Sequence, residues 1–220
     1  MGDAKVCGPN VPFLSLIVAA KHGGKSELCR FICYQYAQQF SYIVVFAPTS
    51  LNGFYQKFLP AAHIHDDYDE EIMKKILLKQ SEYKKREKPV HCLVIFDDVL
   101  GSSTIDFEKR KDNVLNKIWT CQRHYNLSCV VITQRLKGVP KALRENVDWV
   151  FILRTMRSAW PDLHEAFGTM PLKEFEHFVE LKTCNYKCIR YKANVSHPSQ
   201  HYSVFSVPPD FLDRKFKLCF

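Results

Sequence analysis

The sequence lacks the long apolar segment that a membrane-spanning helix requires. Its longest apolar stretch, 11–20, is about half that length and is followed by Lys21. The first residues also lack a basic segment followed by an apolar one, so we expect no secretion signal. No internal repeat or low-complexity linker divides the 220 residues, which are enough for one sizeable hydrophobic core. We therefore expect a single domain over 1–220, with no membrane segment.

Cysteine is present, but not in the pattern of a disulfide framework or a zinc site. The count of nine is odd, and no two cysteines have the C-x2-C spacing that zinc sites favour. Several cysteines lie inside apolar runs, where this residue acts as a small hydrophobe. This usage predicts a reducing compartment and a protein that is not secreted.

Charge is ordinary in amount but unequal in sign. Charged residues make up 25% and hydrophobic residues 46%, which excludes a disordered tail or a fibrous repeat. Basic residues outnumber acidic ones by 31 to 23, giving a net charge of +8. This balance favours a polyanionic partner such as nucleic acid, but a net charge also simply keeps a protein in solution. Composition leaves both explanations open.

Five short apolar runs alternate with helical patterns. The runs are rich in Val, Ile and Phe and apolar at consecutive positions, as in parallel strands covered on both faces. They span 13–19, 42–47, 92–96, 128–133 and 149–153. Helices are predicted at 25–40, 69–86, 113–125 and 140–145. Strands that alternate with helices predict a three-layer α/β fold with a mostly parallel central sheet.

The region after the fifth run predicts an extension at one edge of this sheet. It contains predicted helices at 161–166 and 172–178, a β-hairpin with arms at 179–183 and 186–192, and a short strand at 202–207. We therefore expect a core over about 13–153 and a C-terminal helix and hairpin extension over 154–220.

The first predicted strand leads directly into Ala-Ala-Lys-His-Gly-Gly-Lys-Ser, residues 19–26. The phosphate-loop pattern is G-x-x-x-x-G-K-[ST] between a strand and a helix, and its last three positions match at Gly24, Lys25 and Ser26. Ala19 replaces the first glycine, so this position needs an ordinary backbone geometry. A glycine-rich turn into a helix, followed by a chance Lys-Ser, is the alternative.

The physical chemistry of this segment favours nucleotide binding. Gly23 and Gly24 let the backbone bend so that successive N–H groups face one anion, and the following helix adds its positive end. Lys25 is expected to contact the β- and γ-phosphates of ATP, and Ser26 to hold Mg²⁺. The expected nucleotide-binding residues are Lys21, His22, Gly23, Gly24, Lys25, Ser26 and Glu27.

Two carboxylates and one amide follow the later strands. Asp97 and Asp98 end the run at 92–96, and Gln134 follows the run at 128–133. Parallel strands bind ligands at their carboxyl ends, so we expect Asp97 to face Mg²⁺ through its water shell and Asp98 to act as general base. Gln134 is expected to position water or to report the nucleotide state. Each residue alone is also an ordinary turn residue.

The order of these features favours a particular class of enzyme. A further strand, 42–47, comes between the loop and the acidic pair along the chain, and a second acid follows the Mg²⁺ acid. This arrangement is typical of NTPases that hydrolyse ATP with water and do mechanical work. Small-molecule kinases would also need an arginine-rich lid.

Five motifs together resemble one superfamily. They are Gly-Gly-Lys-Ser at 23–26, Phe-Asp-Asp at 96–98, Arg-His at 123–124, Thr-Gln at 133–134 and Pro-x-x-Leu-Arg-x-Asn at 140–146. The sequence resembles the FtsK/HerA superfamily, and more narrowly the genome-packaging ATPases of poxviruses, other large DNA viruses and virophage-like elements. The resemblance covers roughly 13–153. It implies a RecA-like, ASCE-type P-loop NTPase fold.

The resemblance also implies a function and an assembly. Members form rings, pentamers or hexamers, that use ATP hydrolysis to thread double-stranded DNA into a capsid, so capsid or portal-vertex proteins are expected partners. An arginine finger comes from the neighbouring subunit, with Arg123 the first candidate and Arg144 the second. Asp98 stands where many relatives have Glu, one methylene longer. The expected location is the virion and the host-cell cytoplasm, in the virus factory.

The charge distribution agrees with a DNA partner. Residues 101–150 contain nine basic and five acidic residues, and a packaging ring contacts phosphates without reading sequence. Candidate contacts are Arg135, Lys137, Lys141, Arg154 and Arg157, with Trp160 nearby. Surface charge without a partner is the alternative for each. A helicase or plasmid-transfer motor and a nucleotide-binding scaffold with little hydrolysis remain as alternative functions.

Overall fold

The computed structural model describes residues 5–8, 10–48, 50–88, 90–99 and 114–220, and contains one sheet of eight strands. The spatial order is β3-β2-β4-β5-β1-β6-β7-β8. The strands are β1 (Leu14–Val18), β2 (Tyr42–Phe46), β3 (Ile64–His65), β4 (Cys92–Asp97), β5 (Leu127–Thr133), β6 (Trp149–Ile152), β7 (Lys187–Lys192) and β8 (Tyr202–Ser206). The first six are parallel and the last two antiparallel, so the mostly parallel α/β sheet predicted from the sequence is confirmed.

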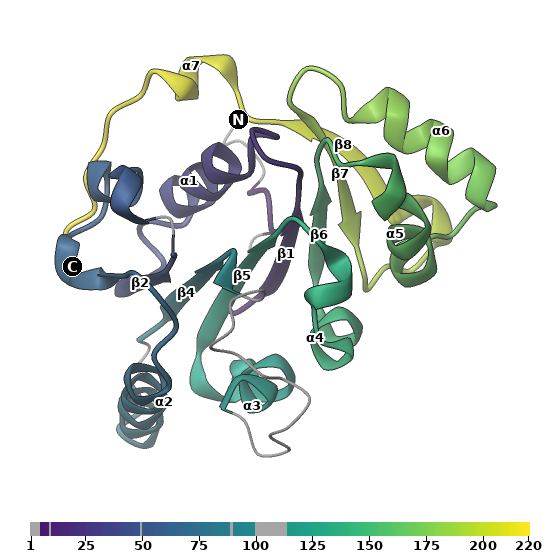
Figure 1. The fold of residues 1–220 in the computed structure, drawn as a ribbon. Coiled ribbons are helices and arrows are strands. Elements are labelled where there is room, and N and C mark those ends of the chain that lie inside the picture. The colour runs from purple at the N-terminus through teal and green to yellow at the C-terminus, as the bar shows by residue number, and fades with distance from the viewer. Residues whose placement is uncertain (1–4, 9, 49, 89, 100–113) are drawn as a thin grey trace.

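Helices cover both faces of the sheet (Figure 1). One face carries α2 (Glu70–Lys85), α3 (Val114–Cys121), α4 (Lys141–Asn146), α5 (Trp160–Phe167) and α6 (Leu172–Lys182). The other carries α1 (Lys25–Gln35), the short α7 (Pro209–Leu212) and the 3-10 turn η2 (Tyr55–Lys57). The expected helix at 113–125 ends in a separate 3-10 turn, η5 (Gln122–Tyr125), and its first residue lies outside the described part.

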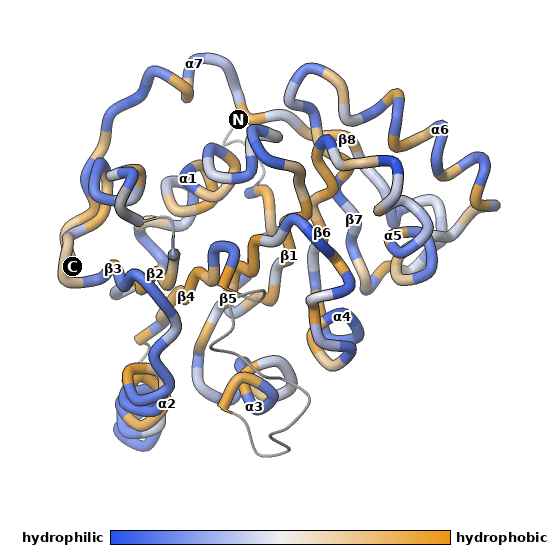
Figure 2. Tube along the Cα trace, in the orientation of Figure 1, coloured by the Kyte–Doolittle hydropathy of each residue, from blue (hydrophilic) through white to orange (hydrophobic). Residues whose placement is uncertain are grey.

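Two hydrophobic clusters, one on each face of the sheet, explain why the strands are continuous apolar runs. Of two consecutive residues of β1, Leu16 belongs to the cluster under α2–α6 and Ile17 to the cluster under α1. Figure 2 shows apolar strands at the centre and many hydrophilic residues in the helices around them. A strand buried on both faces has no polar side, so its residues cannot alternate.

The register of the central strands sets the position of the site. Val18 lies opposite Thr133 in the β1–β5 pair, and Asp97 lies opposite Ile132 in the β4–β5 pair. The three strands therefore end at the same level, at one edge of the sheet. In space β5 separates β1 from β4, whereas β2 lies on the far side of β4.

The predicted hairpin is wrong in one arm. Residues 179–183 belong to the end of α6, where Phe175 and Val179 lie one helical turn apart and are both fully buried. The arm at 186–192 is correct, but its partner is β8, which pairs Lys187 with Ser206 and Tyr191 with Tyr202. Val179 and Leu181 alternate with polar residues in the sequence, but Val179 packs with Phe175 at helical spacing. The extension does lie at one edge of the sheet, as expected.

Candidate functional site

The loop between β1 and α1 is held in a bent shape by its own backbone. The Gly23 N–H donates to the Ala20 carbonyl at 3.0 Å, and the Ala20 N–H donates to the Arg154 carbonyl at 2.8 Å. A Cβ on Gly23 would lie 2.9 Å from the Ala20 oxygen, so only glycine fits there. Gly24 precedes the first residue of α1 with φ of +90°, a conformation that L side chains rarely adopt. Both glycines of the predicted loop are therefore required by its geometry.

Ala19 fits its position without strain. Its φ is not in the left-handed region, its side chain is fully buried, and its N–H donates to the Thr133 carbonyl at 3.2 Å. The residue still belongs to the strand ladder, so the chain bends only after it. The expectation of an ordinary backbone at this departure from the loop pattern is confirmed.

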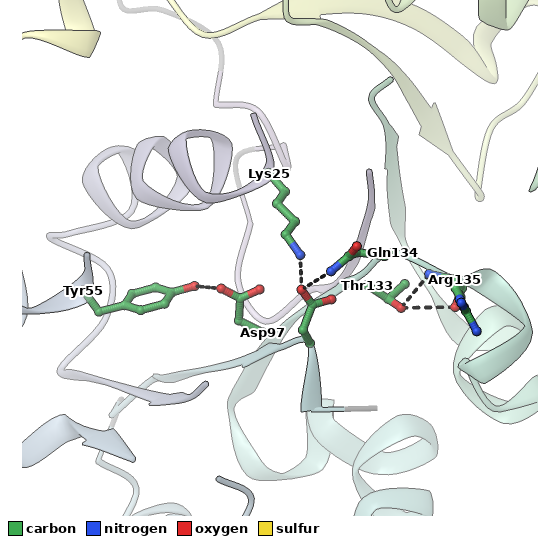
Figure 3. A network of polar contacts seen from close by, with 7 residues as sticks. Lys25, Tyr55, Asp97, Thr133, Gln134 and Arg135 are labelled. Atoms are coloured by element: carbon green, nitrogen blue, oxygen red, sulfur yellow. Dashed lines mark hydrogen bonds and ion pairs between the residues drawn. The ribbon is translucent and has the colours of Figure 1, made fainter. Parts of the chain in front are cut away.

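Side chains from three segments meet on the Asp98 carboxylate. Lys25 Nζ, from α1, forms an ion pair with Asp98 Oδ2, and Gln134 Nε2, from the end of β5, donates to the same oxygen at 2.9 Å. Figure 3 shows Lys25 reaching this point from above and Gln134 from the right. Asp98 has φ of +56°, a strained conformation for a side chain other than glycine, and its N–H donates to Ile132. This twist turns the carboxylate towards the phosphate loop.

Asp97 lies deeper than Asp98 and faces the other way. It is 3% exposed, and the Tyr55 hydroxyl donates to its Oδ2 at 2.7 Å (Figure 3). Its other oxygen, Oδ1, is buried without a hydrogen-bond partner among the described residues. Burial raises the pKa of this carboxyl, while Tyr55 and the nearby Lys25 lower it. A buried carboxylate oxygen without a partner is a position for a cation or its water.

The remaining loop residues divide into two groups. Ser26 is half-buried in the first turn of α1, beside Lys25, whereas Lys21 and His22 are exposed at the top of the loop. Glu27 Oε2 accepts a hydrogen bond from Arg30 Nε at 2.7 Å. Glu27 therefore has a side-chain partner of its own, and the loop N–H groups, Lys25 and Ser26 remain for an anion.

Neither candidate finger lies near the loop of its own chain. Arg123 lies in η5, before β5 begins, and pairs with Asp148, whose Oδ2 also accepts from the Leu14 N–H at 2.8 Å. This position is at the amino edge of the sheet, opposite to Lys25. Arg144 lies on α4, half-buried, with no hydrogen-bond partner for its Nε among the described residues.

The basic candidates for DNA contact are mostly paired. Three of them have acidic partners: Lys137 with Asp162, Lys141 with Glu145, and Arg157 with Glu180. Arg135 and Arg154 are exposed and have no acidic partner in the described part of the chain. Trp160 is 7% exposed and its indole N–H donates to Thr155, so it belongs to the core. Residues 101–113, the first part of the basic segment 101–150, lie outside the described residues.

The described ranges contain neither a protein-only metal cluster nor a membrane-spanning helix. Within them, no group of three or more His, Cys, Asp or Glu residues could hold a metal ion by itself. Among the same residues, no helix has the length and apolarity to cross a membrane.

Sequence reasoning missed Tyr55. It lies in a 3-10 turn after β2, far from any motif, and only the fold brings its hydroxyl to Asp97. Its pattern, an aromatic residue among Phe54 and Phe58, indicates core packing. No sequence signal separates this tyrosine from a structural one.

The elements around the site define a P-loop NTPase fold. They are a strand, a bent glycine loop, a helix that begins with Lys-Ser, and an acidic pair on a strand separated from the first by β5. The chain belongs to the family described as "Poxvirus A32 protein", whose model matches residues 10–175. The resemblance to poxviral ATPases is thus confirmed.

Curated relatives come from other large DNA viruses. Protein L437 of Acanthamoeba polyphaga mimivirus is 34% identical over 151 residues, covering 64% of this chain and 52% of the relative. Protein 088R of Invertebrate iridescent virus 3 is 29% identical over 153 residues, covering 69% of this chain and 57% of the relative. The chain thus spans about half the length of the curated relatives it matches.

Solved structures share the fold at low identity. The genome packaging NTPase B204 of Sulfolobus turreted icosahedral virus 2, in complex with ATP-γS, has a TM-score of 0.66 and 18% identity, covering 89% of this chain and 97% of B204. EssC (ATPases 2 and 3) of Geobacillus thermodenitrificans has a TM-score of 0.56 and 14% identity, and the match covers 83% of this chain and 38% of EssC. The α/β P-loop architecture is common to all three.

The loop geometry predicts that two exchanges of Ala and Gly both lower stability, Gly24→Ala more than Ala19→Gly. Gly24→Ala places a Cβ 3.2 Å from the Tyr186 ring at φ of +90° and should cost about 1–3 kcal/mol of stability. Ala19→Gly restores the usual pattern but only adds backbone freedom, so it should cost about 0.5–1 kcal/mol. Denaturant unfolding of both variants measures this. An Ala19→Gly variant that is more stable than the wild type would contradict the unstrained backbone described for Ala19.

Proposed function

We propose that this chain is an ATP-hydrolysing motor that moves double-stranded DNA to package a viral genome. The observation that carries the proposal is the meeting of Lys25, Asp98 and Gln134 at the carboxyl edge, beside the phosphate loop. Family membership supports it, because this group includes viral packaging ATPases by resemblance and by fold. The location in the virion and the virus factory remains a prediction.

The ion pair between Lys25 and Asp98 has a direct chemical role in this proposal. Phosphate oxygens carry more negative charge than one carboxylate, so Lys25 leaves Asp98 when the triphosphate binds. The freed Asp98 then accepts the proton of the attacking water, which Gln134 orients. In the absence of nucleotide the same pair keeps the base neutralised.

Asp97 and Ser26 form the proposed Mg²⁺ position. Asp97 Oδ1 is the buried oxygen without a partner, and Tyr55 fixes the carboxylate through the other oxygen. Oxygen donors of this kind suit Mg²⁺, which keeps most of its water and takes one or two protein ligands. When bound, the ion would neutralise charge on the phosphates. Tyr55 thus orients Asp97 before the ion arrives.

Lys25→Ala and Asp98→Asn should separate binding from hydrolysis. Lys25→Ala should abolish turnover and weaken ATP binding, because the loop loses its mobile cation. Asp98→Asn keeps the shape but removes the base, so ATP should still bind while turnover falls by roughly 10²–10⁴-fold. Calorimetric ATP binding and a phosphate-release assay measure the two quantities.

An exposed lysine provides the matched control for this pair of variants. Lys85 is exposed at the end of α2, and Lys85→Ala should match the wild type in both assays. Wild-type turnover in Lys25→Ala would remove the phosphate-loop assignment. Loss of ATP binding in Asp98→Asn would assign Asp98 to the metal position.

Double-stranded DNA is the proposed substrate of the motor, contacted through its phosphates. Arg135 and Arg154 support this proposal, since both are exposed and follow strands that end at the carboxyl edge. Contacts of this kind are indifferent to base sequence and release counterions. Capsid or portal-vertex proteins are proposed as further partners.

DNA affinity should fall steeply with salt and be nearly equal for two unrelated duplexes. Arg135→Ala should reduce the slope of log affinity against log salt by about one, because one phosphate contact is lost. Fluorescence anisotropy titrations over a salt series measure the slope, with Lys85→Ala as control. A flat salt response, or strong preference for one duplex, would count against a translocase.

A ring is proposed as the active assembly, of five or six subunits, with Arg123 as the finger in the neighbouring site. The supporting observation is its place at the edge opposite its own loop, where it is 58% exposed as a side chain. Arg144 is the second choice.

The turnover of Arg123→Ala should fall by about 10³–10⁵-fold while ATP binding stays normal, because an arginine finger stabilises charge only in the transition state. Mixing this variant with Lys25→Ala subunits should restore some hydrolysis, since some interfaces then pair an intact loop with an intact finger. Lys117→Ala, on α3, serves as the charge control. If mixed assemblies form but remain inactive, Arg123 does not act between subunits, and Arg144 is tested next.

Two other functions use the same fold. EssC and the type VII secretion ATPase EccC share it with TM-scores of 0.56 and 0.55, which supports a motor or helicase for another polymer as the second candidate. A nucleotide-binding scaffold with little hydrolysis is the third, and the intact cluster of Lys25, Asp98 and Gln134 counts against it. ATPase assays with and without DNA distinguish these functions.

A further inference from the structure

An apolar cavity of about 510 Å³ lies beside the phosphate loop, on the side of the C-terminal extension. It begins at Gly24 and Glu27, at the start of α1, and is closed by the turn before β7, the end of β8 and the residues at α7. Its volume lies within the range of small-molecule sites. The catalytic cluster does not use it.

The direction in which a nucleotide lies in the loop follows from the two sides of the site. Asp98 and Gln134 mark the γ-phosphate end, and Gln134 lines a second, polar cavity together with Lys21 and Arg135. The rest of the nucleotide must leave the loop on the other side. That side is the apolar cavity at Gly24.

The lining of the apolar cavity suits a planar heterocycle. Its fully buried wall consists of Leu28, Leu153 and Cys188, each at most 2% exposed, and Phe205 packs on it from β8. Burial raises the pKa of the Cys188 thiol to about 12, so this side chain stays neutral. Of the polar side chains in the lining, Asn185, Lys187 and Ser206 are exposed, and Glu27 is half-buried and accepts from Arg30.

Tyr186 is the feature of this cavity that packing does not explain. It is 73% exposed although it is a large aromatic residue, and its φ of +58° is strained for such a side chain. Its ring reaches the loop, where a Cβ on Gly24 would lie 3.2 Å from Tyr186 Cδ1. An exposed aromatic face is thus held at the point where the nucleoside would leave the phosphates.

We infer that this cavity binds the nucleobase of the triphosphate, with Tyr186 stacking on its face. The inference rests on the proposed function, because it requires a nucleotide in the loop. Stacking on an aromatic ring works for every base, and an apolar wall rejects a wrong base far less than a site built of hydrogen bonds. The chain therefore binds purine nucleoside triphosphates with little discrimination between adenine and guanine.

The test measures binding of ATP, GTP and inorganic tripolyphosphate, each with Mg²⁺, by calorimetry on the full chain. Tyr186→Ala should weaken ATP and GTP binding by roughly 5- to 100-fold, the effect of one lost stack, and leave tripolyphosphate binding unchanged. Tyr186→Phe keeps the ring and should bind ATP like the wild type. Leu181→Ala, at a residue 56% exposed on α6 and outside the cavity lining, is the control.

Each contrary result has a separate meaning. If Tyr186→Ala and Leu181→Ala bind ATP equally well, or if Tyr186→Ala weakens tripolyphosphate as much as ATP, Tyr186 does not stack on a base and the inference is wrong. An ATP to GTP affinity ratio near 10⁴ would exclude an apolar base site. If the wild type binds neither ATP nor tripolyphosphate, the proposed function falls, and the inference falls with it.

Discussion

The insertion of β5 between β1 and β4 is the constraint on which the site depends. Parallel pairing on both sides of β5 makes β1, β4 and β5 end at one level. The phosphate loop, Asp98 and Gln134 therefore follow these strands at the same edge of the sheet. Asp98 and Gln134 thus lie side by side, and Lys25 reaches the same carboxylate from the start of α1. Parallel pairing with β1 on one side and with β4 on the other holds β5 in this register.

Much of this arrangement could be predicted because it follows from local patterns. The apolar runs predict five strands to within one residue at each end. Asp98 and Gln134 directly follow strands, and Lys25 begins the helix after the phosphate loop. The limits have physical causes. Val179 was placed in a strand because a short apolar alternation suits a strand and a helix end equally well. Tyr55 and Tyr186 lie in turns, and their relation to Asp97 and Gly24 exists only after the chain has folded.

Two of the six non-glycine residues that have a positive φ in the described part of the chain lie beside the phosphate loop helix. Asp98 and Tyr186 both adopt left-handed backbone conformations, one beside Lys25 and the other beside Gly24. Each costs free energy that a glycine or asparagine would save. Ala19, at the position where the loop pattern expects glycine, adopts an unstrained backbone. The departure from the pattern therefore lies at a position that tolerates a side chain.

The cysteines give this molecule a ready experimental handle. Of the nine, all free, Cys184 and Cys219 are exposed, whereas six are buried, and burial raises the pKa of thiols such as Cys7, Cys92 and Cys129. Thiolates, not thiols, react with alkylating reagents, so the buried sulfurs are protected. Cys184 lies two residues before Tyr186 and directly precedes Asn185, which lines the apolar cavity. A maleimide fluorophore attached there would report on the occupancy of that cavity in the otherwise native chain, once Cys219 is replaced.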